Sequence, residues 1–155
     1  VVARSGIALS APCPWNDSIH ACLGDALLAP TRIYVKALGH VMHGEHHVLG
    51  LAHITGGGFT DNLPRMLPES LGAKVDVSRW QRPSLFAWLQ REGQIEPQEM
   101  ARTFNNGIGM VLVVSSSASE QTCSALHDAG EQPVVLGELT AEPGVSFVGL
   151  EHWAA

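Results

Sequence analysis

The chain has 155 residues, of which 45% are hydrophobic and 15% are charged, and its formal net charge at pH 7 is −6. This length is typical of one domain with a substantial core, and the low charge excludes an intrinsically disordered chain. No apolar run approaches the ~20 residues needed to cross a bilayer. The acidic balance argues against a general nucleic-acid binder, because the chain has only two lysines, Lys36 and Lys74, and no lysine-rich stripe to neutralise phosphates. We therefore expect a globular domain that binds neither a membrane nor a nucleic acid.

The cysteines and the first residue bear on location and on processing. Cys13, Cys22 and Cys123 are odd in number, lie far apart and form no Cys-x-x-Cys pair. Such usage fits a reducing compartment, so we expect a cytoplasmic protein. The chain opens on Val1 without a signal-peptide pattern, which is compatible with a processed product or with part of a longer polypeptide.

The element pattern predicts an irregular N-terminal segment followed by alternating helices and strands. Prolines at 12, 14 and 30 mark residues 1–30 as an irregular connecting segment. Apolar runs predict strands at 48–54, 73–77, 109–114, 134–139 and 145–150, with the last two forming a hairpin around the turn at 142–144. Helical patterns fall at 35–43, 61–67, 83–91, 97–104 and 117–129. Ser117 and Glu120 predict a capping box at the start of the last helix.

These elements predict an α+β fold over residues 31–151. Because helices and strands alternate before the terminal hairpin, we expect a layered αβ domain whose mixed β-sheet of about five strands carries helices packed on it.

A group of histidines is the first candidate for chemistry. His43 and His47 have the i, i+4 spacing of metal ligands, and His40 and His46 lie nearby. The group lacks the His-Glu-x-x-His pattern, and Gly44 would weaken the helix that presents the rings. We therefore expect no metal site here and read the group as a polar helix end.

The glycine run at 56–58 is a stronger candidate. It follows a predicted buried strand and precedes a helix, and three consecutive glycines indicate positive φ angles or the close approach of another group. A helix start can bind a phosphate, and Arg65 could add a contact. Asp61, however, already occupies that helix start and would repel an anion, which favours a hydroxyl, an amide or a Mg²⁺-shielded phosphate. A tight strand–helix turn capped by Asp61 is the alternative.

The polar turn at 103–109 is the third candidate. It precedes the most apolar predicted strand, and Asn105 offers both a donor and an acceptor to an amide or a sugar hydroxyl. A simple Asn-Asn-Gly turn into the strand is the alternative.

Three ordered segments together resemble one family. The segments are Pro-Thr-Arg-Ile-Tyr-Val-Lys at 30–36, His-Ile-Thr-Gly-Gly-Gly at 53–58 continuing to Leu67-Pro68, and Met-Ala-Arg-Thr-Phe-Asn at 100–105 continuing to Met110. Together they resemble the C-terminal half of aminoimidazole ribonucleotide synthetase, also called phosphoribosylformylglycinamidine cyclo-ligase. Trp80 and Phe-Ala-Trp-Leu at 86–89 fit the same order. The resemblance covers roughly residues 1–151, with 31–151 as the C-terminal αβ domain.

The resemblance implies an ATP-dependent ligase of purine synthesis. In that family ATP phosphorylates the formamide oxygen of formylglycinamidine ribonucleotide, and an intramolecular nitrogen then closes the imidazole ring. ATP and Mg²⁺ are held mainly by an N-terminal half that lies upstream of Val1, together with a catalytic His-Asn pair, and the family is dimeric. This chain alone is therefore expected to be inactive, and we do not assign His20 or His127 as substitutes for that pair. The substrate-binding residues that the resemblance implies are Thr55, Gly56, Gly57, Gly58, Asn62, Arg65, Thr103 and Asn105.

Some alternatives stay open. His53 fits equally a polar core residue at a strand end and a site residue. The domain could be a non-catalytic ligand-binding or interaction module of the same fold. It could also belong to another ATP-dependent enzyme of the superfamily, such as the selenophosphate, thiamine-phosphate or formylglycinamidine synthetases, although the 103–109 motif favours the cyclo-ligase.

Overall fold

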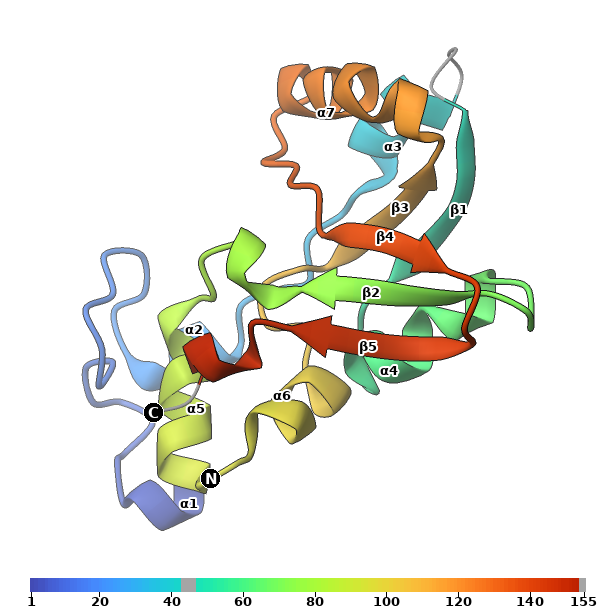
Figure 1. The fold of residues 1–155 in the computed structure, drawn as a ribbon. Helices are drawn as coiled ribbons and strands as arrows, with labels where there is room; N and C mark the ends of the chain where they lie inside the picture. The colour runs from blue at the N-terminus through green and yellow to red at the C-terminus, as the bar shows by residue number, and fades with distance from the viewer. Residues whose placement is uncertain (43–46, 154–155) are drawn as a thin grey trace.

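The computed structural model describes residues 1–42 and 47–153, and their strands form two small sheets (Figure 1). In the first sheet, β1 (Val48–His53) pairs with the antiparallel β3 (Met110–Val114). In the second, β2 (Gly72–Asp76) lies between β4 (Gly137–Thr140), which is antiparallel to it, and β5 (Gly144–Val148), which is parallel. The α+β class and the mixed pairing are confirmed, but the five strands are divided between two sheets of two and three.

The predicted terminal hairpin is wrong, because β2 separates β4 from β5. The pairing places Val145 opposite Ala73 and Phe147 opposite Val75, so the apolar residues of β5 join the same buried face as those of β2. The turn between β4 and β5 crosses the start of β2 closely, since a Cβ on Gly72 would overlap the carbonyl oxygen of Glu142. Both edges of β2 are thereby hydrogen-bonded, which a direct β4–β5 pair would not achieve.

The helices fall into two groups. Figure 1 shows α3 (Val35–Met42) and α7 (Ser119–Asp128) side by side at the end of the molecule that holds β1 and β3. The other group covers the three-stranded sheet and its surroundings, namely α4 (Gly58–Asn62), α5 (Ser84–Gly93) and α6 (Pro97–Thr103). Short 3₁₀ turns complete the main part of the chain at Pro64–Met66 (η1), Val77–Arg79 (η2), Ser116–Ala118 (η3) and Leu150–Trp153 (η4).

Two helix starts differ from the predictions. The helix predicted at 61–67 begins earlier, at Gly58, and changes to a 3₁₀ turn at Pro64, because proline has no N–H to continue the α-helical ladder. The predicted capping box at Ser117 is wrong: Ser117 lies inside η3, and its hydroxyl contacts that of Ser115 at 3.1 Å. Since an N-cap residue needs an extended backbone, a residue within a 3₁₀ turn cannot fill that role.

The main core lies where the three-stranded sheet meets α4 and α6. Phe59 of α4, Met100 of α6 and Val75 of β2 are buried there, and Trp153 near the C-terminus closes it against the ring of Trp80 at 5.9 Å. The core therefore fixes α4 and α6 against the same sheet, which places the loops that adjoin them.

Residues 1–30 are mostly irregular, as predicted, but they contain two short helices, α1 (Val2–Ser5) and α2 (Leu23–Leu27). The turn at 13–22 between them is built around Asp17, whose carboxylate accepts hydrogen bonds from the backbone N–H groups of Ile19 and His20 at 2.8 and 2.9 Å. The ring of Trp15 packs on buried Trp88 of α5 at 5.6 Å. The segment is thus docked on α5.

Candidate functional site

The structure brings the two predicted site loops together, although about 50 residues separate them in the sequence. The end of β1 pairs with the start of β3, with His53 opposite Met110, and the N–H of Ile54 donates to the carbonyl of Gly109 at 2.8 Å. Beyond that pair, α4 packs on α6, and a Cβ on Gly58 would overlap the carbonyl oxygen of Ala101. The loops at 54–58 and 103–109 therefore form one continuous surface, which we call the paired-loop surface.

The three glycines of the run differ in what they do. Gly57 and Gly58 have φ angles of 92° and 53°, in the left-handed region that glycine adopts without strain. A Cβ on Gly57 would also lie 2.6 Å from Oδ2 of Asp61. Gly56 has no left-handed φ, and a Cβ there would meet nothing within 4 Å. The fold therefore explains Gly57 and Gly58, whereas the missing side chain at exposed Gly56 keeps the outer surface open.

Asn62 supports the glycine run from inside the protein. Its Nδ2 donates to the carbonyl oxygens of Gly56 at 3.2 Å and Gly58 at 2.7 Å, and its Oδ1 accepts from Arg65 at 3.3 Å. Only 4% of Asn62 is exposed. The amide of Asn62 therefore sets the shape of the loop, while Thr55 and Gly56 lie exposed on its outer side.

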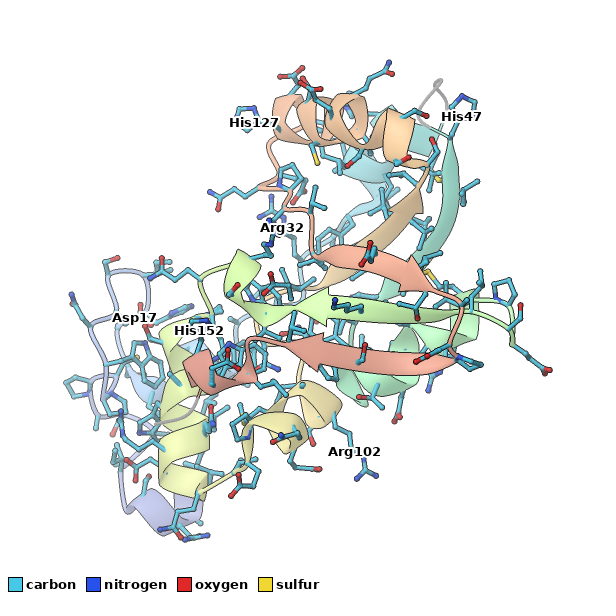
Figure 2. All side chains as sticks on the ribbon, in the orientation of Figure 1. Asp17, Arg32, His47, Arg102, His127 and His152 are labelled. Carbon is cyan, nitrogen blue, oxygen red and sulfur yellow. The ribbon has the colours of Figure 1, made fainter. Side chains whose placement is uncertain are left out.

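The second loop presents Thr103 and Asn105. The Thr103 hydroxyl donates to Oε1 of Glu99 at 2.9 Å, and Oδ1 of half-buried Asn105 accepts from the backbone N–H of Gly107 at 3.0 Å. In the described part of the chain no hydrogen bond is formed by Nδ2 of Asn105. Asn105 thus keeps a donor available at the paired-loop surface. Arg102, which precedes Thr103 on α6, points away from the fold (Figure 2).

His53 lies at the edge of the same surface. It is exposed, so the polar-core interpretation of His53 is wrong. Its ring lies 6.0 Å from that of Tyr34 in an edge-on arrangement, and the Tyr34 hydroxyl occupies the space where a side chain at residue 109 would lie. Burial, and then the charge of Glu131, raises the pKa of Tyr34, so the phenol stays neutral and can donate a hydrogen bond.

Asn106 is the residue of this region that the sequence did not single out. It is fully buried with a φ of 50°, and its Nδ2 donates to the carbonyls of Met100 and Phe104. Its own carbonyl accepts the indole N–H of Trp80 at 2.9 Å. The Asn-Asn-Gly sequence was a usable signal, because asparagine before glycine is typical of left-handed turns.

A groove of about 1240 Å³ lies between the two sheets, bordered by β3, by residues 79–84 and by residues 130–139. Two arginines that border the groove form ion pairs. Nε of Arg32 lies 3.1 Å from a carboxylate oxygen of Glu131, and Nε of Arg79 lies 2.9 Å from one of Asp76. Arg82 donates to Gln90 at 2.6 Å, and burial lowers the pKa of its guanidinium. The carboxylates of Glu131 and Asp76 thus offset the charges of Arg32 and Arg79, whereas Arg82 has a neutral partner and exposed Lys74 also borders the groove.

Of the histidine group, only His40 and His47 lie in the described part of the chain. Within residues 1–42 and 47–153, no three His, Cys, Asp or Glu side chains are arranged to hold a metal ion. His43 and His46 lie outside the described residues, and Figure 2 shows His47 at the start of β1, apart from His127 on α7. In that same part of the chain no helix has the length and apolar character that a membrane crossing needs.

The geometry defines an α+β domain in which a glycine-rich turn and an Asn-Gly turn share one surface. A family comparison agrees with this class: residues 4–149 match the family model described as "AIR synthase related protein, C-terminal domain", and the chain belongs to that family. The resemblance to the C-terminal half of aminoimidazole ribonucleotide synthetase is thereby confirmed. The chain is also 44% identical over 157 residues to the "Bifunctional purine biosynthetic protein ADE1" of Schizosaccharomyces pombe, covering 99% of this chain and 20% of that protein. The chain thus spans about a fifth of the length of this relative.

Proposed function

We propose that the chain is the substrate-site domain of an ATP-dependent cyclo-ligase that closes the imidazole ring of formylglycinamidine ribonucleotide in de novo purine synthesis. The observation that carries this proposal is the paired-loop surface, where the two motifs of the resemblance meet through Ile54 and Gly109. The family and the purine biosynthetic relative support the same activity.

In this proposal the chain binds and orients the substrate. Thr55 and the exposed backbone of Gly56 contact it from one loop, and Asn105 donates to it from the other. Gly57, Gly58 and Asn62 shape the first loop, with Arg65 held beside it by Asn62 and Thr103 beside the second loop. Orienting a formamide and an attacking nitrogen lowers the barrier by removing the entropy cost of bringing them together.

ATP and Mg²⁺ would supply the phosphoryl group that activates the formamide oxygen. On the resemblance, we assign ATP and Mg²⁺ mainly to an upstream half of the enzyme, together with the catalytic residues, and propose a homodimeric enzyme.

An upstream half would need a surface on which to dock. The segment from Leu28 to Val35, the first residue of α3, exposes three large apolar side chains, at 83% for Leu28, 82% for Ile33 and 76% for Val35. Exposed apolar groups at such density are typical of interaction surfaces, which supports a contact between this segment and another part of the enzyme.

Turnover of formylglycinamidine ribonucleotide with ATP and Mg²⁺ tests the proposal. We expect the complete enzyme to cyclise the substrate and the 155-residue chain alone to be inactive. Robust cyclisation by the isolated chain would contradict the assignment of ATP binding and catalysis to an upstream half of the enzyme. In the complete enzyme, Gly56→Ala should raise KM for the ribonucleotide, by about tenfold if a methyl group displaces it by a fraction of an ångström.

Gly39→Ala is the matched control for Gly56→Ala. A Cβ at Gly39, like one at Gly56, meets nothing within 4 Å and needs no left-handed backbone, but Gly39 lies on α3. Both variants should keep the wild-type melting temperature or exceed it slightly. Equal KM values for the two variants would exclude the outer side of the glycine run as a binding surface.

A further inference from the structure

We propose that Asn106 is a positioning residue of the paired-loop surface, which sets the place of Asn105 without contacting the substrate. The inference rests on the proposed function, because it takes the 103–109 loop to be a binding loop. It is carried by the hydrogen bonds of one fully buried side chain.

The side chain of Asn106 ties the end of α6 to the loop that follows it. Its Nδ2 donates to the carbonyl of Met100 at 2.8 Å and to that of Phe104 at 3.0 Å. The last carbonyls of a helix have no partner within the helix, and the Met100 carbonyl also accepts the N–H of Phe104. One amide group therefore holds the last turn of α6 and the first residue beyond it in a fixed relation.

The backbone of Asn106 fixes the other side of the loop. Asn106 and Gly107 have consecutive left-handed φ angles of 50° and 99°, which reverse the chain so that it enters β3. The carbonyl of Asn106 accepts the indole N–H of Trp80, whose ring lies 5.8 Å from that of Phe59 on α4. Asn106 is thus connected to α6 through its side chain and, through Trp80, to the helix that begins in the glycine run.

Asn105 lies directly between these attachments. Its backbone joins Phe104, held by the Asn106 amide, to Asn106 itself, and its Oδ1 is engaged with Gly107. A shift of Asn106 would therefore move the remaining donor of Asn105 relative to the 54–58 loop. The end of α6 touches that loop too, because Gly58 lies against the Ala101 carbonyl.

The Oδ1 atom of Asn106, the amide oxygen, also supports a positioning role for this residue. Among the described residues, its buried Oδ1 has no hydrogen-bond partner, which is unfavourable for stability. Glycine would adopt the same left-handed backbone without that cost. The two bonds from Nδ2, which only the side chain supplies, are therefore the contribution of asparagine at this position.

The experiment compares KM and kcat for formylglycinamidine ribonucleotide in the complete cyclo-ligase. Asn106→Gly keeps the backbone conformation and removes both Nδ2 bonds. We expect KM to rise roughly tenfold or more while kcat changes less than threefold, since displaced binding groups weaken substrate binding. Trp80→Phe, which keeps an aromatic ring but removes the indole N–H, should raise KM in the same direction by a smaller factor.

Thr122→Val is the matched control. The buried Thr122 hydroxyl donates to the Ala118 carbonyl at 2.8 Å, a side-chain-to-backbone bond like those of Asn106, but it lies on α7 away from the paired loops. It should lower the melting temperature and leave KM unchanged. The inference is overturned if Asn106→Gly has a lowered melting temperature but an unchanged KM. If Asn106→Gly does not fold, an unchanged KM in Trp80→Phe overturns the inference instead. A wild-type enzyme that does not bind the ribonucleotide would instead overturn the proposed function, and this inference with it.

Discussion

At the scale of single residues, neighbouring glycines in one run are present for different physical reasons. Gly58 combines a left-handed φ of 53° with contact against the carbonyl of Ala101, so a methyl group there has no space. Gly57 is similarly constrained by Asp61, and a large side chain at residue 57 would disturb the fold whether or not the loop binds a ligand. Gly56 is therefore the position of the run where binding can be tested without disturbing the fold.

Gly58→Ala should destabilise the domain by about 1–3 kcal/mol, because the backbone is strained and α4 must move away from α6. Urea unfolding of Gly58→Ala, Gly56→Ala and the wild type measures the difference. Gly56→Ala should match the wild type in free energy of unfolding. If both variants are equally stable, the close packing of Gly58 on α6 is contradicted.

Asp17 makes stability depend on pH. The backbone N–H and then the side chain of His20, followed by the N–H of Ile19, hold the pKa of Asp17 below its usual range. A carboxyl group whose pKa is lower in the folded state stabilises the fold above its unfolded pKa of about 3.9. That contribution is lost as the pH falls from about 4 toward the folded pKa.

Asp17→Asn tests this pH dependence. The amide keeps one acceptor oxygen, but its NH₂ group would face the indole N–H of Trp15 and Nδ1 of His20, which lie 3.0 and 2.9 Å from Oδ2. We expect the variant to melt at a lower temperature than the wild type at pH 7 and the two melting temperatures to converge below about pH 4. A difference that stays constant from pH 7 to pH 3 would show that the Asp17 charge does not stabilise the fold.

At the scale of elements, local sequence patterns predicted helices and strands that are determined by their own residues. The helix at 97–104 was predictable because Pro97 supplies a start and Glu99 suits the first turn, and α6 begins at Pro97. Strand partners were not predictable in this way. The apolar residues Val145 and Phe147 fit a hairpin with β4 as well as a place beside β2, and the shared core with α4 decides between them.

In the candidate site too, local motifs were predictable from the sequence and contacts between distant residues were not. The glycine run and the Asn105 turn were visible as motifs, and the resemblance placed both at one site. The supporting roles of Asn62 and Asn106 were not visible, because each depends on carbonyl groups that the folded backbone brings into reach. Polar residues that act on the backbone look like ordinary turn residues in a sequence.

The 13–22 turn should detach from α5 when its aromatic contact is removed. Trp15→Ala removes both the ring contact with Trp88 and the hydrogen bond to Asp17, whereas Trp15→Phe removes only the hydrogen bond. Amide exchange in residues 13–22 should be about fivefold faster in Trp15→Ala, which corresponds to an aromatic contact worth about 1 kcal/mol. Trp15→Phe should have a smaller effect, and exchange in α6 should be unchanged in both. Equal exchange in the two variants would show that ring packing does not hold the turn.

At the scale of the whole molecule, the domain has a buried core and yet exposes several large apolar side chains, three of them within residues 28–35. The core joins β2, β5, α4 and α6, so the fold does not use Ile33 and Val35 to stabilise itself. The chain matches about a fifth of the length of the purine biosynthetic relative. In the function we propose, the exposed segment would serve as the docking face and the paired-loop surface as the substrate face.

The isolated 155-residue chain should self-associate through this segment, since exposed apolar groups tend to pair when no partner covers them. The double variant Ile33→Lys and Val35→Glu keeps the net charge and places an acidic residue in the first turn of α3, where the helix dipole favours it. Sedimentation velocity should show more monomer than in the wild type, at an unchanged melting temperature. Ile19→Lys, which alters a side chain of similar exposure (84%) in the 13–22 turn, is the control. If Ile19→Lys reduces association as much as the double variant, general surface hydrophobicity explains the association and the segment is not a specific docking surface.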